Sequence, residues 1–139
     1  MSTSSQTYIG FSGSACRSTK NISSATLVIY SPTDKLISMH GVSVSQKMNN
    51  IAKYNAVIEL LLESISFGIQ SLIVRLDFEL VLLQLNQVYA IRNLILLRLF
   101  LRVRRLEREF DYIEYQHIPK NLNTLADAIV SSVINRQLQ

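Results

Sequence analysis

Two side chains near the end of the chain, His117 and Asp127, are of types that could carry out chemistry, and they lie ten residues apart. An imidazole titrates near neutral pH, so His117 could act as a proton shuttle. The spacing is weak support, because Asp127 can equally stabilise the first turn of a helix through its negative charge. Cys16 is the single cysteine, which excludes an internal disulfide and a zinc site built from cysteines.

The elements that must position these residues follow an α/β order. Strand composition and the turn signal SPTD predict a three-stranded meander, and apolar residues at helical spacing then predict a helix that ends at Gly68. The predicted strands are residues 7–11, 25–31, 35–44, 71–75 and 111–117, and the predicted helices are residues 49–67, 77–86, 90–109 and 123–135. This order indicates a five-stranded mixed sheet with helices on both faces.

Length and composition fit one domain. With 139 residues, 48% of them hydrophobic, the chain can bury a core, and we expect a disordered N-terminus at residues 1–6 and a single domain at residues 7–136. Arginines interrupt the longest apolar stretch, residues 91–103, so no membrane span is expected. The lone cysteine fits a reducing intracellular setting, cytoplasmic or nuclear.

Four short motifs occur in a particular order. They are Phe11-Ser12-Gly13-Ser14, the run NNIAKY that begins at Asn49, Leu76-Asp77-Phe78, and His117-Ile118-Pro119-Lys120 followed by Asn123 and Ala126-Asp127. In order and spacing they resemble the ribonuclease H family, especially retroelement-type domains of plant genomes, whose motifs read FDGS, NNxAEY, a strand ending in DS, and HIPRxxNxxAD. The resemblance covers nearly the whole chain and implies a ribonuclease H-like fold. In that family the HIPR tract connects a strand to a helix. His117 could therefore belong to this connection without any chemical role.

The resemblance also implies an active site that this chain has altered. Active members bring four carboxylates together on two Mg²⁺ ions about 4 Å apart, which activate water and stabilise the leaving oxygen. The corresponding positions here are Ser12, Lys53, Asp77 and Asp127, so two carboxylates are replaced. Asp77 and Asp127 remain as weak metal candidates. No cofactor is expected, except Mg²⁺ if residual activity exists.

Lys53 is the more disruptive replacement, because an ammonium group competes with a metal ion and has only donors. One hypothesis is that Lys53 takes the place of the metal and neutralises Asp77 and Asp127. The alternative is that Lys53 extends to solvent. Phe78 also replaces the serine that usually follows the third carboxylate.

Nucleic-acid contacts are implied at Asn49 and Asn50, with Arg17 and Lys20 near the loop after the first strand. Helix capping accounts for the two asparagines equally well. The loop, STKNISS, lacks the glycines that allow a close backbone approach in the family. The net charge of +4 is compatible with a polyanionic partner. Six arginines, which either contact phosphates or form a solvated helix face, lie at positions 92, 98, 102, 104, 105 and 108.

The predicted helix at residues 90–109 has two apolar ridges. Ile95, Leu99, Val103, Leu106 and Phe110 should cover the core. The second ridge, Leu94, Leu97 and Leu101, predicts a homodimer or a polypeptide partner, unless the short helix at residues 77–86 covers it.

Three functions follow from these patterns. The first is a catalytically inactive ribonuclease H-like domain of retroelement origin that binds nucleic acid, such as an RNA/DNA hybrid or another duplex, or acts as a scaffold. The second is a hybrid-cleaving enzyme with residual activity that uses Asp77, Asp127 and Glu79. The third is a protein-interaction domain without nucleic-acid contact.

Overall fold

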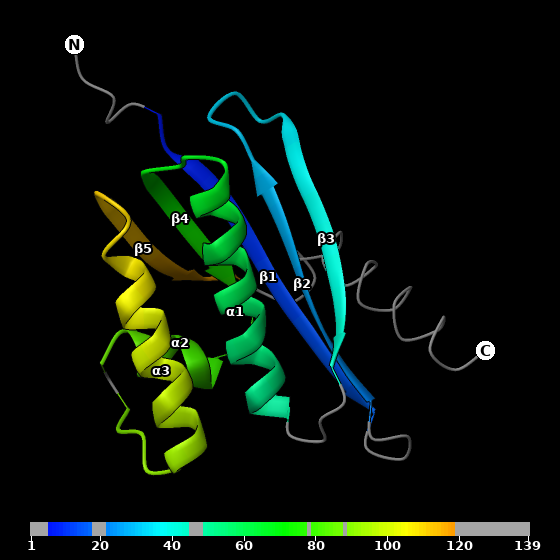
Figure 1. Cartoon of the computed structure of the whole chain (residues 1–139), viewed down its shortest axis with the longest axis vertical. Coiled ribbons are helices and arrows are strands. Elements are labelled where there is room, and N and C mark those ends of the chain that lie inside the picture. The colour runs from blue at the N-terminus through cyan, green and yellow to red at the C-terminus, as the bar shows by residue number, and fades with distance from the viewer. Residues whose placement is uncertain (1–5, 18–21, 45–48, 78, 88, 119–139) are drawn as a thin grey trace.

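A computed structural model describes residues 6–17, 22–44, 49–77, 79–87 and 89–118 (Figure 1). Side chains are not described at residues 13–17, 22–26, 42–44 and 49. The strands are β1 (Tyr8–Arg17), β2 (Ile22–Tyr30), β3 (Leu36–Val44), β4 (Ser71–Leu76) and β5 (Tyr112–His117). The helices are α1 (Asn49–Ser66), α2 (Glu79–Leu85) and α3 (Leu94–Glu107).

The strands form one mixed sheet in the order β3-β2-β1-β4-β5. The β1–β2 and β2–β3 pairs are antiparallel, as a meander requires, whereas β1–β4 and β4–β5 are parallel. A parallel pair needs a crossover connection, and α1 supplies the crossover between β3 and β4. The predicted five-stranded mixed sheet with helices is therefore confirmed. The last predicted helix, residues 123–135, lies outside the described residues.

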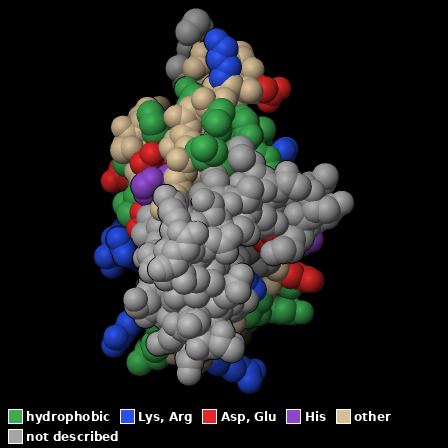
Figure 2. All heavy atoms as spheres, turned by 90° about the vertical axis from the view of Figure 1, so that its right-hand side faces the viewer, with side chains coloured by type: hydrophobic (Ala, Val, Ile, Leu, Met, Phe, Trp, Pro, Cys, Tyr) green, Lys and Arg blue, Asp and Glu red, His purple; other side chains and the backbone are tan. Residues whose placement is uncertain are grey.

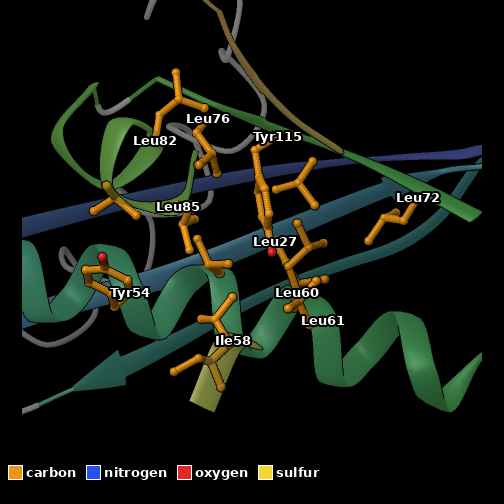
Figure 3. Packing of buried hydrophobic residues seen from close by; sticks show 14 of the residues in the cluster. Leu27, Tyr54, Ile58, Leu60, Leu61, Leu72, Leu76, Leu82, Leu85 and Tyr115 are labelled. Atoms are coloured by element: carbon orange, nitrogen blue, oxygen red, sulfur yellow. The ribbon is translucent and has the colours of Figure 1, made fainter. Parts of the chain in front are cut away.

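Helix α1 packs across β1 and β2, and the buried core lies between them (Figure 1). Leu27, Leu60, Leu72 and Leu76 are fully buried there (Figure 3). The closest approach is at Gly10 in β1, where an added Cβ would lie 2.9 Å from both Cδ atoms of Leu60. Glycine at this position therefore lets α1 approach the centre of the sheet.

Capping interactions mark the end of α1 and the start of α3. Gly68, with a φ of 74°, follows α1, and its N–H donates to the Ile65 carbonyl while the N–H of Ile69 donates to the Ser64 carbonyl. The expected stop at Gly68 is thus confirmed. Helix α3 begins at Leu94 rather than Ala90, because the Asn93 side chain accepts a hydrogen bond from the Leu96 N–H and caps it. Helix α2 begins at Glu79, two residues later than predicted.

The buried side of α3 is rotated relative to the prediction. Val103 is buried as expected, but Leu96 is buried and Ile95 is 51% exposed. Leu96 and Val103 are seven residues apart, so they lie on one line of the helix facing α1, and Ile95 lies about 100° away from Leu96. The assignment of Ile95 to the core is therefore wrong.

The outer edge strand, β3, exposes apolar side chains. Leu36 and Met39 are about half exposed, and the side of the molecule that includes β3 shows hydrophobic groups beside charged ones (Figure 2). In the described part of the chain, no helix is long and apolar enough to cross a membrane.

Candidate functional site

The candidate site lies where β1 and β4 run side by side. Ser12 in β1 pairs with Leu76, the last residue of β4, and its side chain is fully buried. Gly10 and Ser12 are two residues apart, so both project toward α1. The register therefore places Ser12 beside the end of β4, next to the residue that follows it.

That following residue is Asp77, which is half-buried. On the other side of β4, Leu76 pairs with His117, and the Leu76 carbonyl accepts a hydrogen bond of 2.9 Å from the Ile118 N–H. Asp77 and His117 thus stand at the same end of the parallel strands, although His117 is exposed. Glu79, the alternative carboxylate, is exposed in the first turn of α2.

Helical geometry positions Lys53 relative to Ser12. Lys53 precedes Leu60 by seven residues, so the two share a side of α1 and lie about 10.5 Å apart along its axis. Leu60 packs on Gly10, and α1 runs opposite to β1 (Figure 1). About three strand residues cover the same distance. We therefore expect Lys53, which is half-buried, to lie near the Ser12–Gly13 segment of β1.

The residue after Lys53 anchors this part of α1. Tyr54 is fully buried, and its hydroxyl donates a 2.6 Å hydrogen bond to Oε1 of the buried Gln84 in α2. Burial raises the pKa of Tyr54 to about 12, while the positive charge of Arg104 lowers it in part. The sequence indicated a buried Tyr54 but not its partner, because nothing in the spacing of Gln84 distinguishes it from an exposed residue.

The described site residues offer a hydroxyl, an ammonium group and one carboxylate. A hydroxyl is a weak ligand for a hard cation, and an ammonium group donates hydrogen bonds and repels a metal. Among the residues that the structure describes, no three His, Cys, Asp or Glu side chains gather to form a metal site. This donor set does not fit a pair of Mg²⁺ ions. Asp127 lies outside the described residues.

The predicted nucleic-acid contacts are described only in part. Asn50 is half-buried in the first turn of α1. Asn49 begins the same helix and Arg17 ends β1, but their side chains are not described. Lys20 lies outside the described residues. The role of Asn49 and Arg17 in binding stays a prediction.

One arginine of the basic stretch, Arg104, forms contacts with other residues of the domain. Arg104 forms a 2.7 Å salt bridge with Glu107, donates to the Leu85 carbonyl in α2, and lies over the Phe100 ring. The Tyr115 hydroxyl donates a 2.6 Å hydrogen bond to the same Glu107 carboxylate. Burial and the negative charge of Glu107 raise the pKa of Tyr115. Arg104 therefore joins α3 to α2 and β5, whereas the other five arginines are exposed.

The three leucines of the second ridge of α3 differ in exposure. Leu94 and Leu101 are 63% and 50% exposed. Leu97 is half-buried and, with Phe100, lines an open hollow formed with residues 89–91 and two glutamines of the α2 region. The segment between α2 and α3, rather than α2 alone, therefore flanks Leu97, and Leu94 and Leu101 stay exposed.

Solved structures share this arrangement of strands and helices. RNase H1 from the archaeon Halobacterium salinarum superposes with a TM-score of 0.90 at 25% identity, over 94% of this chain and 98% of that chain. LC11-RNase H1 in complex with an RNA/DNA hybrid superposes with a TM-score of 0.89 at 23% identity, over 95% of this chain and 99% of that chain. The latter similarity shows the fold alone. The fold is thus that of a ribonuclease H-like domain.

Sequence comparisons define the family. The family model described as Reverse transcriptase-like matches residues 10–133. The chain therefore belongs to this reverse transcriptase-like family of the ribonuclease H group, as its motifs predicted.

Curated relatives are longer than the matched region. Ribonuclease HI of Halobacterium salinarum is 29% identical over 108 residues, which are 78% of this chain and 54% of that protein. A bifunctional protein of Mycobacterium tuberculosis is 26% identical over 97 residues, which are 70% of this chain and 27% of that protein. The chain thus spans about a quarter to a half of these relatives.

Proposed function

We propose that this chain is a ribonuclease H-like domain of retroelement origin that binds an RNA/DNA hybrid or a related duplex without cleaving it. In this role it acts as a binding or scaffolding module. The family match supports the retroelement origin, because reverse transcriptase-like domains include those of retroelements. The loss of cleavage is argued from the site, since function depends on the site rather than the fold.

Lys53 carries the proposal. The helical spacing of Lys53 from Leu60 supports a position near the segment of β1 that contains Ser12, and the pairing of Ser12 with Leu76 brings that segment beside the end of β4, where Asp77 follows. A cation at the place where the family binds metal opposes metal binding, and Ser12 adds no negative charge to offset it. Two-metal hydrolysis therefore has no adequate ligand set here.

Hybrid binding rests on separate observations. LC11-RNase H1, which has the same fold, is solved in complex with an RNA/DNA hybrid. This chain carries a net charge of +4, and a basic protein gains affinity for a duplex by releasing counterions from phosphates. Binding of this kind needs no catalytic metal, so it can persist after the carboxylates are lost.

The test is to titrate a fluorescent RNA/DNA hybrid with the full chain, with and without Mg²⁺, and to follow cleavage on a gel. We expect saturable binding that does not depend on Mg²⁺, and no cleavage in Mg²⁺ or Mn²⁺. Cleavage that disappears in an Asp77→Asn variant would establish residual nuclease activity and contradict the proposal. Failure to bind any duplex would also contradict the proposal and would favour a protein-interaction domain without nucleic-acid contact.

A double variant tests whether Ser12 and Lys53 are the cause of the proposed loss of metal binding. Ser12→Asp with Lys53→Glu restores two anionic ligands, so calorimetry should detect divalent-ion binding that the parent chain lacks. The control is Lys35→Glu, which makes the same charge change as Lys53→Glu but at an exposed turn. Equal Mg²⁺ binding by the control and the double variant would show that net charge alone, and not the site, governs the ion.

A further inference from the structure

The outward side of α3 combines exposed leucines with exposed arginines in a regular order. Leu94, Arg98, Leu101 and Arg105 follow one another at spacings of four, three and four residues, so they lie along one line of the helix. We refer to these four residues as the α3 outer face. All four are exposed, whereas Leu96 and Val103 on the opposite side are buried against the core. Packing of the domain therefore does not explain the leucines.

Among the residues that the structure describes, no salt bridge neutralises the arginines of this face. Within the described residues, the salt bridge of α3 joins Arg104 to Glu107, on the inner side of the helix. Glu107 also accepts the Tyr115 hydroxyl, so its carboxylate is already used. Arg98, Arg102 and Arg105 are exposed and form no such ion pair among these residues. The outer face thus combines exposed leucines with exposed arginines that keep their positive charge.

We propose that the α3 outer face docks an acidic amphipathic helix of another polypeptide. Leu94 and Leu101 are one heptad apart, and Arg98 and Arg105 occupy the flanking position of each heptad. In paired helices this flanking position selects the partner by charge, so acidic residues would be favoured there. The apolar side of the partner helix would cover the leucines, as in other helix recognition.

Two other occupants fit less well. A second copy of the chain would bring Arg98 and Arg105 against the same arginines, and like charges across an interface are unfavourable. A nucleic-acid backbone would pair with the arginines but would leave Leu94 and Leu101 facing phosphates. This role is separate from the hybrid binding proposed above, because the site around Ser12 lies on α1 and the sheet.

The test uses a synthetic helix with leucines at its heptad core and glutamates at the flanking positions, labelled for fluorescence anisotropy. The full chain should bind this peptide and should bind a matched lysine peptide roughly tenfold more weakly or worse. The variants Leu94→Ser with Leu101→Ser, and Arg98→Glu with Arg105→Glu, should each weaken binding by roughly tenfold. Leu36→Ser, at another half-exposed leucine on β3, is the matched control and should bind like the parent chain.

Several outcomes would overturn the proposal. They are no binding of the acidic peptide, equal binding by the double variants, or equal loss in the Leu36→Ser control. Sedimentation that shows a dimer dissociated by Leu101→Ser would assign the face to a second copy. Loss of hybrid affinity in the arginine variant, with peptide binding unchanged, would assign it to nucleic acid. Circular dichroism of each variant checks that it remains folded.

Discussion

Lys53 is the side chain on which the proposed loss of cleavage depends. The β1–β4 register brings Ser12 beside the end of β4, where Asp77 follows, and Lys53 lies in the second turn of α1, which packs against β1. The position is therefore inherited from the fold, while its chemistry is set locally.

The first prediction tests whether the Lys53 charge stabilises the fold. If Lys53 neutralises nearby carboxylates in this half-buried position, Lys53→Met should lower the free energy of unfolding by about 1 to 3 kcal/mol. Urea denaturation measures the change, and Lys35→Met at an exposed turn is the matched control. An unchanged midpoint for Lys53→Met would mean that the ammonium group extends into water.

The second prediction concerns Tyr54 at alkaline pH. Its pKa is raised from 10.0 to about 12 in the folded protein, first by burial. The unfolded chain therefore releases this proton at lower pH than the folded protein does. The stability that Tyr54 contributes is complete below pH 10 and is lost as the pH rises to about 12.

The variant Tyr54→Phe removes this dependence and also the hydrogen bond to Gln84. We expect a loss of about 1 kcal/mol at neutral pH, because Gln84 stays buried without its partner. The further loss between pH 10 and 12 should be smaller than in the parent chain. Tyr89→Phe, at an exposed tyrosine, is the control. A parallel decline of the parent and Tyr54→Phe would show that Tyr54 does not titrate in this range.

At this scale the motifs predicted that Ser12, Lys53 and Asp77 lie near one another. The β1–β4 register brings Ser12 beside Leu76, which Asp77 follows, whereas the proximity of Lys53 stays a prediction. The sequence could not pair Tyr54 with Gln84 or assign Arg104 to Glu107 and Leu85. These hydrogen-bond partners depend on how α2 and α3 pack against α1 and β5. Sequence spacing alone does not reveal them, because many helical glutamines and arginines occur at similar positions without such partners. Asp127 and Lys20 remain predictions.

At the scale of elements, Gly10 controls how closely α1 approaches the sheet. A methyl group at this position would lie 2.9 Å from Leu60, so Gly10→Ala should destabilise the protein by about 1 to 3 kcal/mol. Combining it with Leu60→Val should recover part of this loss, because the smaller side chain leaves room. Thermal unfolding of the two single variants and the double variant gives the coupling.

Gly68 provides a contrast for the same experiment. Nothing lies within 4 Å of an added Cβ there, so Gly68→Ala should cost about 1 kcal/mol through its φ of 74° alone. Changing Leu60 should not relieve that cost. Relief at both glycines would show that the contact with Leu60 is not the cause.

Element boundaries were less predictable than element order. The end of α1 was correct because Gly68 is a strong stop signal, whereas the start of α3 was placed four residues early. Apolar residues before Asn93 continued the helical pattern, and only the hydrogen bond from Leu96 shows that Asn93 is the cap. The core side of α3 was misjudged because leucines occur all around this helix, so periodicity alone did not distinguish Leu96 from Ile95.

At the scale of the whole molecule, the fold followed from strand and helix order together with the motifs. The parallel pairing of β1 with β4 could not be read from periodicity, because a buried strand looks the same in either direction. The sequence therefore predicted a mixed sheet, and the structure gives the pairing itself.

The last prediction separates the two proposed surfaces. Hybrid affinity should fall steeply with salt because phosphate contacts release counterions, and Leu94→Ser with Leu101→Ser, which leaves the net charge unchanged, should leave this affinity within about a factor of two. Peptide binding should be weakened in the same variant. Anisotropy titrations at two salt concentrations measure the hybrid affinity and the peptide affinity. A large loss of hybrid affinity in this variant would show that the hybrid and the peptide bind the same surface.

The position of β1 at the centre of the sheet also affects how the chain folds as it is synthesised. The meander β1–β2–β3 consists of near neighbours, but β1 receives β4 only after the intervening helix is complete, as the hydrogen bond between Thr7 and Ser71 across 64 residues illustrates. Until then one edge of β1 exposes unpaired backbone groups, which are a template for aggregation. A ribosome that pauses before β4 emerges would prolong this vulnerable interval, and chaperones that shield strand edges would matter most at that point.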